Sequence, residues 1–176
     1  DKRYLKDADF VEPDQRLAVV QKTPTDEYIL RDKSLDYRVL NFAVSTFNDN
    51  NTSYWHKSVG GYHPAKLRRY QEMIENHISK EMAYLQQQIP AVQGDMAKIN
   101  SDSIGVINML NTKYFIFPTG GGKTAPVENP YAYGNAWFVE NVKYVQNANE
   151  EIDALNTTVP TKTAVVSNDF KQVFNG

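Results

Sequence analysis

Apolar residues alternate over several short stretches of the chain, and this pattern predicts β-strands. Residues 37–44 form the clearest strand, because apolar side chains occupy both of its faces. One face carries Tyr37 and Val39, and the other carries Leu40, Phe42 and Val44. Further strands are expected at residues 113–117, 136–145 and 164–166, and the imperfect alternation within 136–145 indicates a bulge.

Helical spacing of apolar residues predicts helices between these strands. The longest is expected from Pro64 to Pro90, and its apolar side is formed by Leu67, Tyr70, Ile74, His77, Ile78 and Leu85. Shorter helices are expected at residues 23–32, 103–110 and 147–155. The helix at 23–32 begins with a capping threonine, a proline and acidic residues, and the helix at 147–155 also has acids in its first turn.

Strands that alternate with helices predict an α/β fold, in which a layered sheet of mixed or mostly parallel strands has flanking helices. Residues 1–22 are mixed and charged and contain Pro13, so an extended N-terminal arm is expected there, with a short strand at residues 17–20. Residues 23–176 are then expected to form a single α/β domain. A chain of 176 residues is long enough for a hydrophobic core of its own.

Composition narrows the class of protein. Hydrophobic residues make up 41% of the chain and charged residues 23%, which is typical of soluble globular proteins. The formal net charge of -2 argues against a nucleic-acid partner, whose binding domain is usually basic. No apolar run approaches the roughly 20 residues that cross a bilayer. The start lacks both Met and a signal peptide, and the end is abrupt, which together indicate a piece of a longer protein.

Residues 120–124, Gly-Gly-Gly-Lys-Thr, resemble the end of a phosphate-binding loop. That motif requires a glycine where Phe117 stands and a helix directly after Thr124. Pro126 and Pro130 prevent such a helix. We therefore expect a hairpin turn at this point of the chain.

The sequence contains no pattern typical of a metal or catalytic site. The three histidines, His56, His63 and His77, lack the spacing of metal ligands. The absence of cysteine excludes thiolate ligands, disulfides and cysteine nucleophiles. Paired acids on the expected helices are typical of solvated faces. No catalytic residue, metal or cofactor is predicted, although a triad that forms only in the folded chain stays open.

The densest group of side chains that could bind a ligand lies between residues 48 and 69. Aromatic, histidine and basic residues mingle there around Gly60 and Gly61, and the candidates are Tyr54, His56, Lys57, Tyr62, His63, Lys66 and Arg69. Aromatic rings stack on sugar faces, and cationic groups bind phosphate. In the alternative interpretation the aromatic residues anchor the core and the basic residues form a solvated helix face.

Several longer stretches resemble a known family. They are DYRVLN at 36–41, TFN at 46–48, TSYWHKSVGGYH at 52–63, AKLRRYQ at 65–71, NMLNTKY at 108–114 and GNAWFV at 134–139. Together they resemble the soluble extracytoplasmic region of the YfhO family of bacterial membrane proteins, in the form found in Bacteroides-like organisms. The resemblance covers most of the chain and is weakest at residues 1–15, 86–102 and 118–128.

The resemblance implies a parent protein with many membrane helices, similar to the GT-C glycosyltransferases that use lipid-linked sugars. Such enzymes carry their catalytic acid between early membrane helices, so this chain is expected to lack catalytic activity. It would lie on the extracytoplasmic, periplasmic face of the inner membrane and contact the transmembrane and β-rich parts of the same chain. It would assist binding of an acceptor glycan or a lipid-phosphosugar in cell-envelope glycosylation. The alternative role is that of a structural scaffold without a ligand.

Overall fold

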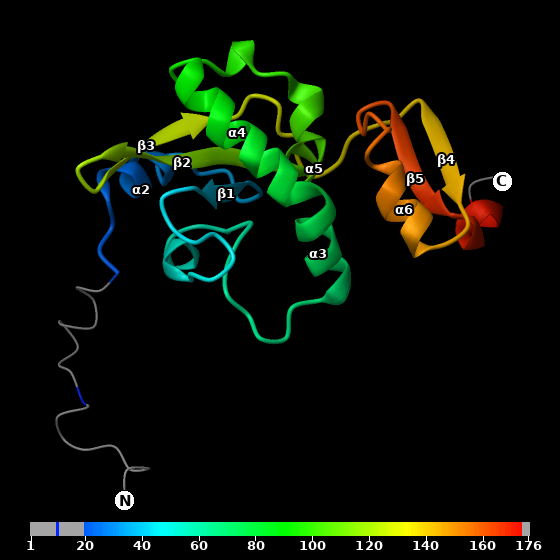
Figure 1. The fold of residues 1–176 in the computed structure, drawn as a ribbon, viewed down its shortest axis with the longest axis horizontal. Coiled ribbons are helices and arrows are strands. Elements are labelled where there is room, and N and C mark those ends of the chain that lie inside the picture. The colour runs from blue at the N-terminus through cyan, green and yellow to red at the C-terminus, as the bar shows by residue number, and fades with distance from the viewer. Residues whose placement is uncertain (1–9, 11–19, 174–176) are drawn as a thin grey trace, which may run out of the picture.

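Two sheets form the framework of the computed structural model, which describes residue 10 and residues 20–173 (Figure 1). The first sheet has the order β1-β2-β3, with β1 at Arg38–Asn41, β2 at Thr112–Gly120 and β3 at Lys123–Glu128. Strand β1 runs parallel to β2, and β3 runs antiparallel to it. The second sheet pairs β4, Asn141–Val145, in parallel with β5, Thr163–Ser167. The predicted α/β class with mixed strands and flanking helices is confirmed.

A long helical segment crosses one face of the first sheet (Figure 1). It consists of α3 at Arg68–Met73, a π-helical turn at Ile74–Ile78 and α4 at Ser79–Ala91. The helix predicted from Pro64 is therefore confirmed, but it begins at Arg68. Leu67, which was expected on the apolar side of this helix, precedes it and is 77% exposed.

The remaining helices are short. They are α2 at Pro24–Ile29, α5 at Gly105–Met109 and α6 at Ala148–Ala154, with 3₁₀ turns at Asn51–Tyr54, Met96–Lys98, Ser101–Ile104 and Asn168–Val173. Helix α2 starts with a capping box, in which Thr23 and Asp26 satisfy each other's backbone N–H groups. Asn147 caps α6 through its side chain. The predicted arm at residues 1–22 and its strand at 17–20 lie largely outside the described residues.

The two faces of the first sheet bury separate apolar clusters. On one face Leu40, Phe42, Phe115 and Phe117 pack with the long helix, through Ile74, Ile78 and Leu85 among others. On the other face Val39, Tyr114 and Ile116 pack against Ile29 of α2. The strand predicted at residues 37–44 is shorter in the structure and covers only Arg38–Asn41. Val39 and Leu40 are buried on its two faces as predicted, whereas Tyr37 and Val44 are only partly buried. No helix within the described ranges is long and apolar enough to cross a bilayer.

The glycines at 120–122 form the turn of the β2–β3 hairpin. All three have φ between 58° and 91°, a region that favours glycine. Because Lys123 to Glu128 continue as strand β3, no helix N-terminus follows the glycines. The expected hairpin turn is confirmed.

The strand predicted at residues 136–145 is wrong in its first half. Only Asn141–Val145 pairs in a sheet, as β4. Before it, Trp137 turns inward and its Nε1 donates a hydrogen bond to the carbonyl oxygen of Pro160 over 2.9 Å. Phe138 is fully exposed. The segment before β4 therefore joins the two sheets without pairing in either of them.

Candidate functional site

The residues expected to bind a ligand fall into two groups in the folded chain. Tyr54, Tyr62 and His63 are exposed, and Lys66 is partly exposed. We call these residues the loop surface. The remaining candidates have partners within the protein. His56 is buried against Asp26, Lys57 donates to the carbonyl oxygen of Leu35, and Arg69 forms an ion pair with Glu151.

Backbone contacts hold the loops that carry the loop surface close together. The backbone N–H of Tyr62 donates to Oδ1 of Asn50 over 2.7 Å, and that of Gly61 donates to the carbonyl oxygen of Thr46 over 2.7 Å. A Cβ atom at Gly60 would lie 2.0 Å from the same Thr46 oxygen. Only glycine permits this approach, so the Gly60-Gly61 sequence explains how the loops pack.

The free edge of β1 anchors the same loops to the sheet. Ser58 forms a parallel bridge with Val39, in which Val39 N–H donates to Lys57 and Val59 N–H donates to Val39. From the other side the hydroxyl of Tyr70, in α3, donates to the carbonyl oxygen of Val59 over 2.6 Å. The stretch between Tyr54 and Tyr62 is therefore fixed at its centre by both the sheet and the long helix.

A buried His56–Asp26 pair supports the loop that carries Tyr54. His56 Nε2 donates to Oδ1 of Asp26 over 2.8 Å, and both residues are buried. Burial raises the pKa of Asp26, but the hydrogen bonds from His56 and Thr23 outweigh this effect and lower it overall. The Nδ1 atom of His56 is buried and has no hydrogen-bond partner within the described part of the chain. The pair ties α2 to the loops across 30 residues of sequence.

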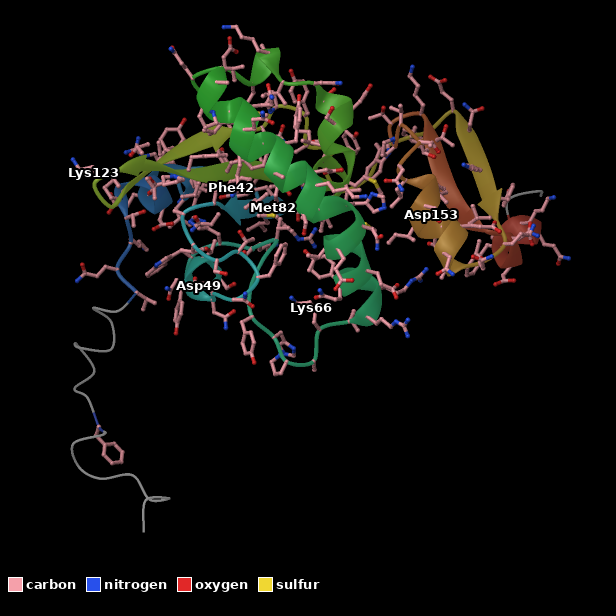
Figure 2. The ribbon with its side chains drawn as sticks, in the orientation of Figure 1. Phe42, Asp49, Lys66, Met82, Lys123 and Asp153 are labelled. Atoms are coloured by element: carbon pink, nitrogen blue, oxygen red, sulfur yellow. The ribbon has the colours of Figure 1, made fainter. Side chains whose placement is uncertain are left out.

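Lys66 lies at the end of the loop surface next to an aromatic ring. Its Nζ is 5.3 Å from the centre of the Phe47 ring. Figure 2 shows Lys66 and Asp49 on the side of the molecule that carries the loops, away from the hairpin tip marked by Lys123. Both oxygens of Asp49 accept hydrogen bonds from Asn51. The loop surface therefore combines exposed aromatic rings, a histidine and a cation.

A second cluster of ionisable groups joins the end of α2 to β2. Lys113 donates to Oδ2 of Asp32 over 2.6 Å, and the hydroxyl of Tyr114 donates to the same oxygen over 3.0 Å. The hydrogen bond from Lys113 holds the pKa of Asp32 far below its usual value. Burial, with the hydrogen bond to Asp32, raises the pKa of Tyr114. These hydrogen bonds tie the segment that follows α2 to β2.

Sequence reasoning missed a cavity beside the second sheet. Its volume is about 500 Å³, and it lies between the start of the long helix, α6 and β5. Arg69 is the only residue of the predicted group that lines it. Trp137 provides the one aromatic ring of the lining. The apolar segment around Trp137 was the only feature of the sequence that pointed to this cavity, and we interpreted it as part of a strand.

The side chains in the described ranges contain no group of three histidine, aspartate or glutamate residues close enough to hold a metal ion. No family model matches the chain, and comparisons with curated proteins and with solved structures also gave no match. The site geometry and the α/β framework are therefore the basis for a functional proposal.

Proposed function

We propose that this chain is an extracytoplasmic accessory domain of a membrane protein of the YfhO type, similar to GT-C glycosyltransferases. Its loop surface would assist the binding of an acceptor glycan or of a lipid-phosphosugar head group in cell-envelope glycosylation. The catalytic residues would belong to the membrane part of the parent protein. The observation that carries the proposal is the pair of exposed tyrosines, Tyr54 at 61% and Tyr62 at 57%, on loops that are pinned together.

The chemistry of the loop surface suits a phosphorylated sugar. Exposed tyrosine rings offer apolar faces for sugar C–H groups, and their hydroxyls exchange hydrogen bonds with sugar hydroxyls. Lys66 supplies a positive charge for phosphate. Because the backbone contacts of Gly60, Gly61 and Asn50 fix the loops before a ligand arrives, little conformational entropy is lost on binding.

Sugar phosphates and envelope glycans are expected to bind the isolated chain, and Tyr62→Ala is expected to weaken this binding about tenfold, as loss of about 1.4 kcal/mol would. Lys66→Ala should weaken the binding of sugar phosphates more than the binding of neutral glycans, because it removes only the contact between the lysine charge and the phosphate. Isothermal titration calorimetry measures both effects. Tyr28→Ala is the matched control, since Tyr28 is an exposed tyrosine of α2 outside the loop surface. Absent binding, or equal affinity in Tyr62→Ala and the parent sequence, contradicts the proposal.

A second candidate function, a scaffold that packs on the β-rich and transmembrane parts of the parent chain, is supported by a different surface. Large apolar side chains are exposed around the second sheet: Phe138 at 101%, Val142 at 41%, Phe170 at 56% and Val173 at 72%. Three of these residues belong to β4 and to the 3₁₀ turn at Asn168–Val173, which contact each other. Exposed apolar side chains on neighbouring elements are typical of a protein interface.

The scaffold role predicts that Phe138 becomes covered in the full-length parent protein. Because the chain has no cysteine, Phe138→Cys introduces the only thiol of this domain. Its reaction with a maleimide should be at least tenfold slower in the full-length protein than in the isolated chain. Leu35→Cys, at a residue that is 76% exposed elsewhere, gives the control rate. Equal rates for Phe138→Cys in both proteins would exclude a scaffold contact at this surface.

A further inference from the structure

The cavity beside the second sheet is a pocket that opens to solvent and has the size of a small-molecule site. Its volume is about 500 Å³, which falls within the range of such sites. Its apolar lining comes from the long helix, α5, α6, β5 and the connecting segment, and includes Met73, Met109, Trp137, Ile152, Leu155 and Val165.

Hydrogen bonds hold the elements that form the walls of the cavity in place. Trp137 is held by its hydrogen bond to Pro160, and its ring centre lies 5.0 Å from that of Tyr133. His77, in the π-helical turn, donates from Nε2 to the carbonyl oxygen of Ile152 over 2.8 Å. That bond ties α6 to the long helix. The cavity therefore lies between elements that are joined by these hydrogen bonds.

The charged groups of the lining come from α3 and α6, and each of them is already paired. Arg69 Nη2 donates to Glu151 Oε2 over 2.5 Å, which spans from α3 to α6. Glu72 accepts from Nε of Arg68 over 2.9 Å. Each carboxylate that lines the cavity thus has an arginine partner, so the cavity presents both hydrogen-bond donors and acceptors without a dominant charge.

We propose that this cavity binds a neutral amphipathic small molecule, which places an apolar body against Trp137 and the methionines and a hydroxyl-bearing head at the Arg69–Glu151 pair. A hydroxyl group can donate to Glu151 and accept from Arg69 at once, so it leaves the ion pair intact. A charged head group would be repelled by the residue of the pair that has the same sign of charge. The mixture of one aromatic ring, flexible methionines and aliphatic side chains suits an alkyl chain. This inference is independent of the loop surface.

Three ligands with the same hexyl chain test the assignment: hexyl glucoside with a neutral head, heptanoate with an anionic head and hexylammonium with a cationic head. Binding is followed by the fluorescence of Trp137 in a Trp55→Phe background, because these are the only tryptophans of the chain. Hexyl glucoside is expected to bind in a saturable manner and at least tenfold more tightly than either charged ligand.

A variant that fills the cavity locates the binding. Ala164→Phe places a ring in the lining and should reduce the affinity for hexyl glucoside at least tenfold, whereas Ala83→Phe adds the same atoms at an exposed position of α4 and should not. Ala148→Leu is a milder filling variant if Ala164→Phe fails to fold. The Tyr62→Ala variant should keep its affinity for hexyl glucoside. This result would show that the cavity and the loop surface are separate sites. No saturable binding, equal affinity for the three ligands, or full affinity in the folded filling variants would overturn the proposal.

Discussion

His56→Ala is expected to lower the free energy of unfolding by about 3 kcal/mol, since it removes a buried hydrogen bond to Asp26 and leaves a cavity where the imidazole packs. Asp26 keeps other hydrogen-bond partners, which limits the loss. Thr23 still donates to Asp26 from its backbone N–H over 2.8 Å and from its hydroxyl over 2.7 Å. The loss therefore comes from the hydrogen bond between His56 and Asp26 and from the space that the buried imidazole leaves.

Urea unfolding followed by circular dichroism measures this change. Lys98→Ala is the control, because Lys98 pairs with Asp95 on the surface over 3.1 Å and its removal should not shift the midpoint measurably. His56→Gln, whose amide can still donate to Asp26, should lose less than His56→Ala. If His56→Ala and Lys98→Ala unfold at the same urea concentration, the pair does not support the loops as we infer.

The same pair has a consequence for stability in acid. Burial raises the pKa of Asp26, but the hydrogen bonds from His56 and Thr23 outweigh it and hold the folded-state pKa below its ordinary value of 3.8. The stabilisation from its ionised form is therefore present above about pH 3.8 and is lost as the pH falls through the lower folded-state value. An Asp26→Asn variant should lack this acid-dependent contribution.

Raising the pH from 4.5 to 7 is expected to lower the free energy of unfolding by about 3 kcal/mol through Glu81. Burial raises the pKa of Glu81 from 4.5 to about 7, although two backbone hydrogen bonds act in the opposite direction. The folded chain keeps the Glu81 proton in this range while the unfolded chain releases it. Stability from this group is complete below pH 4.5 and declines as the pH rises through 7.

The geometry explains why this carboxyl group is buried. Glu81 extends from α4 to the start of α5, where its oxygens accept from Val106 N–H over 2.9 Å and from Ile107 N–H over 2.8 Å. Ile104, at the cap position of α5, has no side chain that can cap the helix. Glu81 thus satisfies backbone groups that would otherwise lack partners.

Unfolding of Glu81→Gln at several pH values tests this expectation. The decline of stability between pH 4.5 and 7 should be weaker in this variant than in the parent sequence, because glutamine has no proton to release. Glu75→Gln, at an exposed residue of the same long helical segment, should keep the full decline. A parallel pH profile for Glu81→Gln and the parent sequence would contradict the raised pKa.

Local sequence signals were sufficient for most elements of the fold. The capping box at Thr23, the glycines at 120–122 and the apolar spacing around Ile78 and Leu85 act over a few residues, so they can be recognised without a partner. The start of the long helix at Arg68 could not be predicted in this way. Pro64 offered an equally good first position, and the chain instead folds into loops up to Leu67.

The candidate site depends on contacts between distant residues, and these were not visible in the sequence. His56 and Lys66 looked alike as possible ligand-binding residues, yet only His56 meets an aspartate 30 positions earlier and becomes buried. Trp137 lies in an apolar run typical of a strand. Its inward position depends on a carbonyl group at Pro160, which no spacing rule anticipates.

Strand β2 supplies side chains to both buried clusters of the first sheet. Phe115 and Phe117 belong to the cluster under the long helix, whereas Tyr114 and Ile116 belong to the cluster under α2. Loss of packing on one face would displace the strand that the other face needs, so neither cluster can melt alone. The helices on both sides of this sheet therefore belong to one cooperative folding unit, with β2 as the element they share.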